Sequence, residues 1–396
     1  MGRKLLITLV VFLSLLLAAG FAGIAAVELT PMLSGPVTPQ TTTLPPQTTA
    51  APTTQAATVP PQTTLPPETT LPIETTVPQP EYFTLTFVGD CTLGSDPNSM
   101  GSGSFVKVIG EDYGYPFRNV AEYFHNDECT FINLEGVFAE GGKRADKTYA
   151  FRGPRAYGNI LTEGSVEAAT LANNHIKDFG EAGLRSTMEV LDERQIHYTI
   201  RDSSVLFDTA SGLRIGMYGI SFWMDKADMR AEVAALRENG ADIVILAMHS
   251  GDEGSYLPTE KQIDYAHAAI DAGVDIVWGH HSHRLQPIEY YNGGIIYYSL
   301  SNFSFGGNRK PSDMDTVIVQ QQIIRQPDGT VELGELNLIP CAMSSKTSIN
   351  DYQPTPYEPD SPEWNRALSK LDGTYAGPDY IPSYDRPAET TPTTDG

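Results

Sequence analysis

The sequence predicts an α/β fold with a mainly parallel sheet, and three observations support this prediction. Short apolar segments alternate with helical patterns through the middle of the chain, which favours parallel strands joined by right-handed crossovers. Most of these apolar segments end in Asp, Glu, Asn or His. Toward the C-terminus the pattern changes to strand-like segments around a turn at residues 326–329, which predicts an antiparallel sheet region that completes the domain.

The expected elements follow from the periodicity of apolar residues. The parallel strands are expected at residues 83–88, 129–132, 167–171, 213–218, 242–248 and 274–278. Helical patterns occupy residues 116–124, 181–194, 229–238 and 259–272. Antiparallel strands are expected at residues 295–299, 316–324 and 331–338. These elements define one domain at residues 82–345, followed by a C-terminal extension at residues 346–396 that ends in a low-complexity tail.

The N-terminal region carries a different pattern. Arg3 and Lys4 precede an apolar stretch at residues 5–27, which is long enough to span a bilayer. Residues 1–30 are therefore expected to form a single-pass membrane anchor with these charges inside, and a cleaved secretory signal is the alternative. Residues 31–80 are rich in Pro and Thr and cannot bury a core, so we expect a disordered spacer. This organisation predicts a protein at the cell membrane with the bulk of its chain outside.

Charge and cysteine content narrow the classes of function. The net charge of −23 argues against a nucleic-acid-binding protein, which needs a basic face. Cys91 is expected at the end of one strand and Cys129 at the start of another, which is too far apart for a disulfide bond. We therefore expect these two and Cys341 to be buried thiols without a structural bridge.

Polar side chains that could bind a metal ion follow the expected strands. These are Asp90, Glu135, Asn174 with His175, His249 with Glu253, and the run His280, His281 and His283. Parallel strands place their carboxyl ends at one edge of a sheet, so residues far apart in sequence should meet there. Carboxylates, imidazoles and an amide oxygen suit Mn, Fe or Zn, and one or two such divalent ions are expected.

Taken singly, each of these residues also allows a structural interpretation. Asp90 could cap a helix, Asn174 could belong to a turn, and His249 could be a core histidine. Glu135 could be a surface charge. The histidine run at residues 280–283 is the hardest to explain in this way, because alternate side chains of an extended backbone point in the same direction.

The motifs together resemble a known family. Gly89-Asp90, Asn133-Leu-Glu135, residues 171–175, residues 249–253, residues 279–283 and residues 299–303 look like the bacterial capsule-synthesis CapA family, which is tied to poly-γ-glutamate production. That family is itself similar to calcineurin-like metallophosphoesterases. The resemblance covers about residues 82–345 and implies a four-layer α/β/β/α sandwich.

The resemblance also implies roles for individual residues. By this likeness Asp90 and Glu135 are metal ligands, with Glu135 bridging, and Asn174 binds the second metal. His175 protonates the leaving group, while His249, His281 and His283 complete the ligand shell. His280 stands where phosphoesterases usually have glycine. Thr92 stands where they have a histidine ligand, so one metal site lacks an expected ligand.

A basic segment follows Glu135 in the sequence, with cations at residues 143, 144, 147, 152 and 155. This segment could receive an anionic substrate beside the metal ions, or it could be a solvated loop. Arg152 is the best single candidate for substrate binding, because apolar, Pro and Gly neighbours would hold it in place. Glu253 and His280 are further candidates for substrate contacts.

Two hypotheses of function follow. The first is a membrane-anchored extracellular protein that serves the synthesis, attachment or release of an anionic capsule or envelope polymer such as poly-γ-glutamate, by metal-dependent hydrolysis or transfer. The second is a non-catalytic accessory subunit of a polymer synthase or export complex. Both predict an anionic polymer or phosphoester ligand, capsule synthase subunits as partners, and no nucleic acid.

Overall fold

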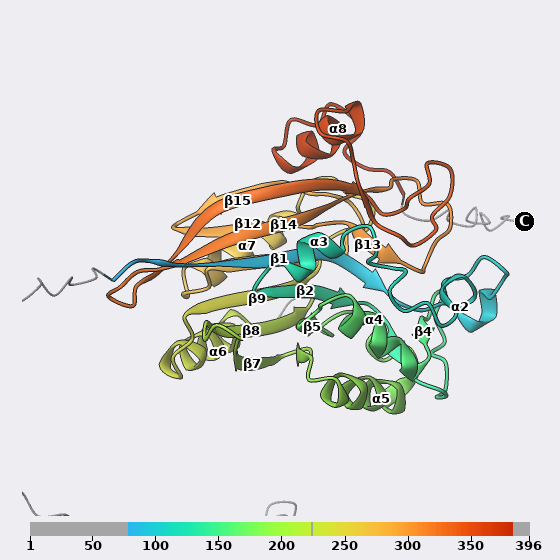
Figure 1. Ribbon diagram of the computed structural model, residues 1–396, viewed down its shortest axis with the longest axis horizontal. Coiled ribbons are helices and arrows are strands. Elements are labelled where there is room, and N and C mark those ends of the chain that lie inside the picture. The colour runs from blue at the N-terminus through green and yellow to red at the C-terminus, as the bar shows by residue number, and fades with distance from the viewer. Residues whose placement is uncertain (1–77, 223–224, 383–396) are drawn as a thin grey trace, which may run out of the picture. The chain divides into compact units, whose positions relative to one another are not determined.

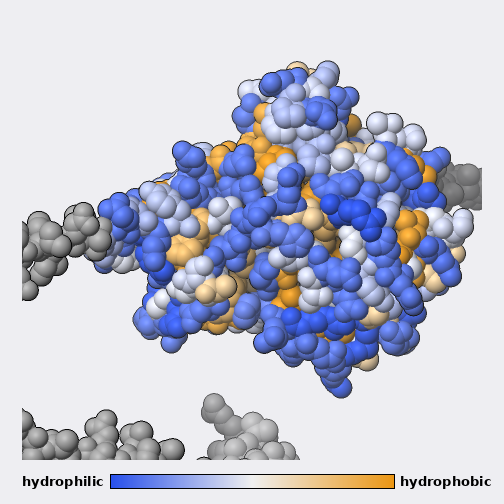
Figure 2. All heavy atoms as spheres, viewed as in Figure 1, coloured by the Kyte–Doolittle hydropathy of each residue, from blue (hydrophilic) through white to orange (hydrophobic). Residues whose placement is uncertain are grey.

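A computed structural model of the protein describes residues 78–222 and 225–382 (Figure 1). The expected membrane anchor, nearly all of the expected spacer and the low-complexity tail lie outside these residues. No helix in the described part is long and apolar enough to cross a membrane. The surface shown in Figure 2 is mostly hydrophilic, with scattered apolar side chains.

The first sheet has the strand order β16-β15-β14-β1-β2-β5-β6, and β13 also pairs with β1. Its strands are β1 (Glu81–Thr92), β2 (Cys129–Leu134), β5 (Ala168–Thr170), β6 (His197–Thr199), β13 (Asn302–Phe305), β14 (Asp315–Arg325), β15 (Val331–Ala342) and β16 (Thr355–Pro356). β1, β2, β5 and β6 are parallel neighbours, whereas β14, β15 and β16 continue the sheet with antiparallel pairing.

The second sheet has the order β11-β12-β10-β9-β8-β7. Its strands are β7 (Ser203–Asp208), β8 (Arg214–Ser221), β9 (Ile243–His249), β10 (Ile276–His280), β11 (Ile288–Tyr291) and β12 (Gly294–Tyr297). The four central strands are parallel, and both edge strands are antiparallel to their neighbours. β9 is buried along its whole length, which is typical of a central parallel strand. A separate parallel pair consists of β3 (Val137–Phe138) and β4 (Arg152–Gly153).

The helices lie mainly outside the two sheets. They are α2 (Phe105–Ile109), α3 (Ala121–His125), α4 (Gly158–Glu163), α5 (Gly180–Glu193), α6 (Lys226–Glu238), α7 (Glu260–Ile270) and α8 (Pro362–Leu371), with short 3₁₀ segments η1 (Pro97–Ser99) and η2 (Arg155–Tyr157). α7 begins with a capping box formed by Thr259 and Gln262. α8 belongs to the expected C-terminal extension and packs against β14 and β15.

Three large apolar clusters define the layers. The cluster between the sheets includes Leu85 and Phe87 of β1, Phe131 of β2 and Trp278 of β10. The Phe87 and Phe131 rings stack 4.8 Å apart, and the Trp278 indole donates a 3.0 Å hydrogen bond across the interface to Val88 O. A second cluster joins the first sheet to α2–α5, and a third joins the second sheet to α6 and α7. The order is therefore α/β/β/α, as predicted (Figure 1).

The structure corrects three expectations about topology. The six expected parallel strands divide between two sheets, so their ends form a shared rim and not one sheet edge. Segment 295–299 contributes β12, which is parallel to β10, and the antiparallel strands β14 and β15 extend the first sheet because β14 pairs along most of the long β1. The expected helix at residues 116–124 begins only at Ala121, because the preceding residues form successive turns with bonds such as Val120 N to Phe117 O.

The cysteines behave as expected. Cys91, Cys129 and Cys341 are all buried and unpaired. Burial raises the pKa of the Cys129 thiol well above its usual range, which keeps it protonated. These residues act as small apolar core residues.

Candidate metal centre

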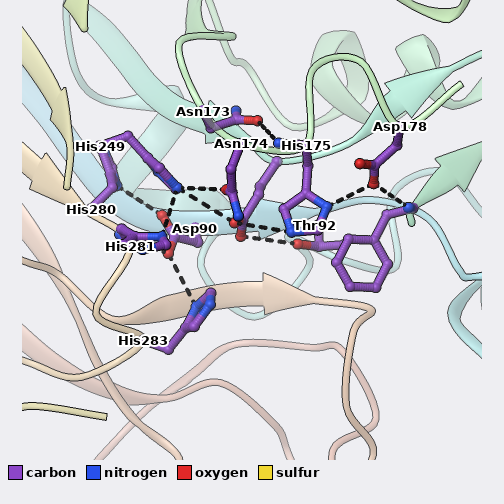
Figure 3. Close-up of polar contacts among 12 residues, drawn as sticks. Asp90, Thr92, Asn173, Asn174, His175, Asp178, His249, His280, His281 and His283 are labelled. Atoms are coloured by element: carbon purple, nitrogen blue, oxygen red, sulfur yellow. Dashed lines mark hydrogen bonds and ion pairs between the residues drawn. The ribbon is translucent and has the colours of Figure 1, made fainter. Parts of the chain in front are cut away.

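The carboxyl ends of strands from both sheets meet at one end of the sandwich (Figure 3). Asp90 lies near the end of β1, and Glu135 directly follows β2. On the opposite sheet, β9 ends at His249 and β10 ends at His280. The loop after β5 carries Asn174 and His175, and the loop after β10 carries His281 and His283. All of the expected metal ligands are thus brought to one place, with each sheet supplying part of the set.

One group of ligand atoms forms around Asp90. Single ligand atoms of Asp90, Glu135 and His283 all lie within 4.8 Å of one another, and the three residues are buried. His283 Nδ1 lies 3.3 Å from Asp90 Oδ2 and 2.7 Å from Asn302 Oδ1. This spacing allows one cation to contact all three side chains.

A second group forms around His249. Its Nε2 lies 2.9 Å from Asn174 Oδ1, 3.1 Å from His281 Nδ1 and 3.7 Å from Glu135 Oε1. A neutral imidazole carries only one N–H, so protons alone cannot satisfy all of these close contacts between lone-pair atoms. A cation at their common point would satisfy them. Because Glu135 belongs to both groups, it occupies the position of a bridging ligand.

Glu135 provides the best test of whether a metal ion fits. Its Oε1 is buried and has no hydrogen-bond partner, a costly arrangement for a carboxylate oxygen. Burial raises the pKa of Glu135 to about 8, and the negative charge of Asp90 adds to this effect. Among the described residues, the ion pairs of Asp90 and Glu135 involve histidines alone. No Lys or Arg of the described residues pairs with either carboxylate, so both acids face imidazoles, and this donor set suits a divalent ion.

The imidazoles around the centre have different charge states. Burial would lower the pKa of His283, but Asp90 and Glu135 outweigh it and raise the pKa to about 9. Burial lowers the pKa of His281 to about 4, with the neighbouring His283 adding to the effect, and burial also holds the pKa of His249 well below its usual range. His281 and His249 are consequently neutral near pH 7, which is the form that binds metal ions.

His175 is held by a network of its own. Its Nδ1 lies 2.6 Å from Asp178 Oδ2, and Asp178 also accepts hydrogen bonds from Phe151 N and Lys147 Nζ. The opposite nitrogen, Nε2, lies 3.9 Å from Glu135 Oε1 and so faces the centre. Burial lowers the pKa of His175 and Asp178 opposes this effect. Asp178 thereby fixes the ring in an orientation suited to proton exchange at Nε2.

Asparagine side chains shape the loops that carry the ligands. The Asn173 amide donates to Asn133 Oδ1 and Leu134 O at 2.9 Å, and its oxygen accepts from the backbone N of His175. Asn133 in turn donates to Asp90 Oδ1 at 2.7 Å. The sequence did not predict the roles of Asn133, Asn173 and Asp178. Asn133 and Asn173 stand within two of the family motifs, whereas the signal for Asp178 was its position three residues after His175.

The loop after β10 has an unusual backbone. His281 has a φ of 91° and His283 a φ of 53°, in the left-handed region that non-glycine residues rarely adopt. Such conformations persist only where surrounding contacts enforce them, and they concentrate at functional sites. Here they turn both imidazoles toward the two ligand groups.

Thr92 stands beside Glu135, where the family pattern led us to expect a histidine ligand. Its hydroxyl lies 3.4 Å from Glu135 Oε2 and the residue is fully buried. The group around Asp90 therefore has one fewer imidazole than the group around His249.

The expected substrate-binding residues lie in three different environments. His280 is completely buried behind Asp90, with Nδ1 3.0 Å from Asp90 Oδ1 and its ring against Trp278, so a substrate has no direct access to it. The Arg152 guanidinium packs over the Phe179 ring at 4.6 Å. Glu253 is exposed and close enough to contribute to the raised pKa of Glu135.

The basic segment does not form a single cluster. Arg144 pairs with Asp96, whereas Arg155 pairs with Glu189 and Glu193 on α5. Of its cations, Lys147 reaches the centre, where it contacts Asn174 O and Asp178. Arg144 and Arg155 are thus neutralised by acids that are distant in sequence, whereas a role of Arg152 in substrate binding stays a prediction.

A cavity of about 450 Å³ adjoins the centre on the side of Asn174. Its lining includes the apolar side chains of Ile176, Leu184 and Ile200 and the exposed ring of Phe222. Phe222 also packs edge-on against His281, with ring centroids 5.3 Å apart. The candidate centre is thus open to a ligand from this side.

Comparison with known proteins agrees with the motifs and the fold. The family described as bacterial capsule synthesis protein PGA_cap matches residues 84–200 and 201–307, which together make up more than half of the chain. The chain belongs to this family. Its matched ranges contain every one of the candidate ligands, and the resemblance inferred from the motifs is confirmed.

Individual relatives are 27–30% identical to this chain over the aligned residues. The capsule biosynthesis protein CapA of Bacillus anthracis is 28% identical over 291 residues, covering 65% of this chain and 68% of that protein. The PGA biosynthesis protein CapA of Bacillus subtilis is 27% identical over 319 residues, covering 74% of this chain and 78% of that protein. A probable polyglutamine synthesis accessory protein of Mycobacterium tuberculosis is 30% identical over 228 residues, covering 48% and 60%.

Similar solved structures include the NAD nucleotidase of Haemophilus influenzae, with a TM-score of 0.38 and 13% identity over 77% of this chain and 65% of that chain. A purple acid phosphatase from yellow lupin has a TM-score of 0.32 and 8% identity over 70% and 53%. Such low scores carry no assignment of activity. The fold class rests on the two packed sheets and their helices.

Proposed function

We propose that this PGA_cap protein serves the synthesis, attachment or release of an anionic capsule or envelope polymer of the poly-γ-glutamate type, and that its domain cleaves a bond of that polymer with the help of a divalent cation, passing the released group to water in hydrolysis or to another acceptor in transfer. The names of its CapA relatives support the choice of polymer. The arrangement of acidic, amide and imidazole ligands supports the requirement for a cation.

The observation that carries the proposal is the buried Glu135 Oε1, which has no hydrogen-bond donor although ligand atoms on both sides face it. A buried carboxylate oxygen kept only for stability would be expected to have a hydrogen-bond donor. Among the described residues Glu135 Oε1 has none, since Thr92 reaches only Oε2, and His249 Nε2 faces it at 3.7 Å, an arrangement typical of a metal ligand.

The residues of the centre divide into binding and proton-transfer roles. Asp90, Glu135 and His283 would hold one cation of the Mn, Fe or Zn type, and Asn174, His249 and His281 would hold a second with Glu135. A bound cation supplies Lewis-acid polarisation of a substrate oxygen. His175 gives its Nε2 proton to the leaving group, while Asp178 holds the opposite nitrogen in place.

Metal analysis and a hydrolysis assay on the full-length chain test this function. We expect His175→Ala to lower turnover of a γ-glutamyl polymer or a phosphodiester by about 10²–10⁴-fold while the metal content stays unchanged. His125→Ala is the matched control, since His125 lies exposed on α3, outside the centre. Equal turnover in His175→Ala and wild type would show that His175 has no role in proton transfer.

A second candidate is a non-catalytic accessory subunit of a polymer synthase or export complex. Thr92 favours this alternative, because a missing imidazole leaves the group around Asp90 with fewer ligands. Bound metal with no turnover of either substrate, together with co-purification of a synthase subunit, would support the accessory role.

The proposal includes a location. Residues 5–27 would anchor the chain in the cell membrane, and residues 31–80 would hold the folded domain outside it. An epitope placed at the C-terminus should then be accessible on intact cells and sediment with membranes. An epitope protected until the cells are lysed would contradict the extracellular location.

A further inference from the structure

A second cavity, of about 340 Å³, shares no lining residue with the cavity beside Asn174. Its wall includes Phe151, whose ring lies 4.6 Å from the His175 ring, and Tyr149, whose ring is parallel to that of Phe151 within 8°. A ligand in this cavity would therefore lie within one aromatic ring of the candidate proton donor. The rest of the lining is small and polar, with glycines and serines of residues 99–104 and residues 306–308.

Arg309 gives this cavity a cation that is not neutralised by the protein. The side chain is exposed, and within the part of the chain that the structure describes its guanidinium makes no hydrogen bond and no ion pair. By contrast, Arg144 and Arg155 of the basic segment are both paired with carboxylates. In a protein with a net charge of −23, an unpaired arginine in a cavity is a candidate receptor for an anion.

The position of Arg309 depends on a glycine. A Cβ added at Gly103 would lie 1.2 Å from Arg309 Nη1, so the guanidinium occupies the space of the missing side chain. Tyr352 fixes this loop from below, because its hydroxyl donates a 2.8 Å hydrogen bond to Gly103 O. The loop at residues 101–104 therefore forms a seat for the arginine.

Two further polar groups fit an anion in this cavity. The Ser104 side chain is 9% exposed, and its hydroxyl is buried without a hydrogen-bond partner. Asp96 also lines the cavity, but Arg144 binds both of its oxygens and Ala150 N donates to one of them. With Asp96 neutralised, Arg309 gives the cavity a positive charge.

We propose that this cavity is a substrate subsite that binds a carboxylate group of the polymer chain, with Arg309 as the residue that selects for it. The inference rests on the proposed function for the identity of the polymer, and it adds where the chain lies relative to His175. A polymer held here would extend from the Arg309 subsite past His175 toward the 450 Å³ cavity beside Asn174. The metal centre would thus act on a polymer chain that occupies both cavities.

Binding of a synthetic γ-linked glutamate oligomer to the full-length chain in detergent tests the subsite. Calorimetry in the presence of a chelator removes contributions from turnover and from bound cations. We expect Arg309→Gln to weaken binding about ten-fold or more, because charge-assisted bidentate hydrogen bonds are lost. Lys310→Gln is the matched control, since it removes the same charge from an exposed neighbour that does not line the cavity, and we expect less than a two-fold change, on the order of a surface charge effect.

Gly103→Ala provides a second variant that keeps the charge. The added methyl group must displace the guanidinium, so this variant should also weaken binding, whereas Gly141→Ala should not, since Gly141 does not line the cavity and a Cβ there meets nothing within 4 Å. Equal losses in Arg309→Gln and Lys310→Gln, or unchanged binding in Arg309→Gln, would overturn the subsite. Displacement of the oligomer by inorganic phosphate more readily than by glutarate would overturn the assignment to carboxylate.

These results are separate from the outcome of the hydrolysis assay. Oligomer binding that depends on Arg309 with no turnover on any substrate would contradict the catalytic function and leave the subsite in place. Turnover that depends on His175, together with oligomer binding that is unchanged in Arg309→Gln, would contradict the subsite and leave the catalytic function in place.

Discussion

Two regions of the molecule bury acidic side chains, and the partners of these side chains differ between the two regions. Asp315 at the start of β14 is fully buried and accepts hydrogen bonds from Arg366, Lys370 and Tyr357 at 2.7–2.8 Å. Lys370 on α8 also contacts Asp313, and its side chain is only 1% exposed. At the candidate centre, Asp90 and Glu135 are buried just as deeply but meet imidazoles, an amide and a hydroxyl.

The difference in partners distinguishes a structural ion-pair cluster around Asp315 from a candidate binding site at the centre. Burial would raise the pKa of Asp315, but Arg366 and Lys370 outweigh it and lower the pKa, so the protein supplies its own countercharge. This cluster attaches α8 to the first sheet. Among the described residues, no Lys or Arg pairs with the two carboxylates of the centre, which meet the His283 imidazole instead, and Glu135 Oε1 remains without a donor. A buried carboxylate that is paired with Lys and Arg side chains stabilises the fold. A buried carboxylate oxygen that lacks a partner is suited to bind a metal ion.

A third pair of acids lies at the opposite end of the first sheet. Burial raises the pKa of Asp127 to about 6 and that of Glu167 to about 7. Neutral donors hold both carboxyl groups: Thr130 Oγ1 donates to Asp127, and Thr130 N and Ser165 Oγ donate to Glu167. In the described part of the chain, no Lys or Arg pairs with these two acids and no cluster of metal ligands includes them, so protonation is the route that relieves the charge.

The largest expected effect comes from breaking the internally paired cluster. Lys370→Met leaves Asp313 and Asp315 with less countercharge in a buried site, and we expect the free energy of unfolding to fall by about 3–5 kcal/mol. Chemical denaturation measures this change. Adding Asp313→Asn in the same chain should recover part of the loss, and the absence of any recovery would show that the lysine acts through packing alone.

The second effect concerns a cation added at the centre. A divalent ion at 100 times its Kd should raise the free energy of unfolding by about 2.7 kcal/mol, because it binds the folded state alone. Glu135→Gln should remove most of this stabilisation, whereas Glu111→Gln, at an exposed position, should retain it. Thermal melts with and without Mn²⁺ give the comparison, and equal shifts in both variants would contradict a role for Glu135 in metal binding.

The third effect is a pH dependence at Glu167. Its pKa in the folded state, about 7, lies above the ordinary value of 4.5, so its contribution to stability is present below pH 4.5 and is lost as the pH rises through 7. Glu167→Gln removes this loss. Between pH 5 and pH 8 the wild type should lose about 1–2 kcal/mol more than the variant, after allowance for partial exposure. Parallel pH profiles of the two proteins would show that the carboxyl titrates normally.

The smallest effect is expected at Thr92. Its hydroxyl is a long, weak donor to Glu135, so Thr92→Val should change the free energy of unfolding of the metal-free protein by less than about 1 kcal/mol. Isothermal denaturation in a chelator is the measurement. A loss of several kcal/mol would mean that Thr92 already completes the Glu135 carboxylate, as Arg366 and Lys370 complete that of Asp315.

The sequence allowed a good prediction wherever local rules decide the outcome. Each expected strand exists because a short apolar run must be buried, and Asp90, Glu135, Asn174 and His249 meet because strand ends carry loops. The α/β/β/α layering came from the resemblance between motifs. Local pattern alone assigned all parallel strands to a single sheet.

The remaining features depend on contacts between segments that are distant in the chain. Division into two sheets is decided by pairing partners, which apolar periodicity does not encode. Arg155 of the basic segment is paired because Glu189 and Glu193 of α5 reach it across the fold. The pairing of Lys370 with Asp315, 55 positions away, has no local signature either.

The left-handed backbone at His281 and His283 has a kinetic consequence. Each such conformation costs on the order of 1–3 kcal/mol, which the folded core must offset before any ion arrives. The two rings are then already aimed, so ion capture requires no loop rearrangement and little loss of chain freedom. Association should accordingly be limited by dehydration of the incoming ion and not by movement of the loop.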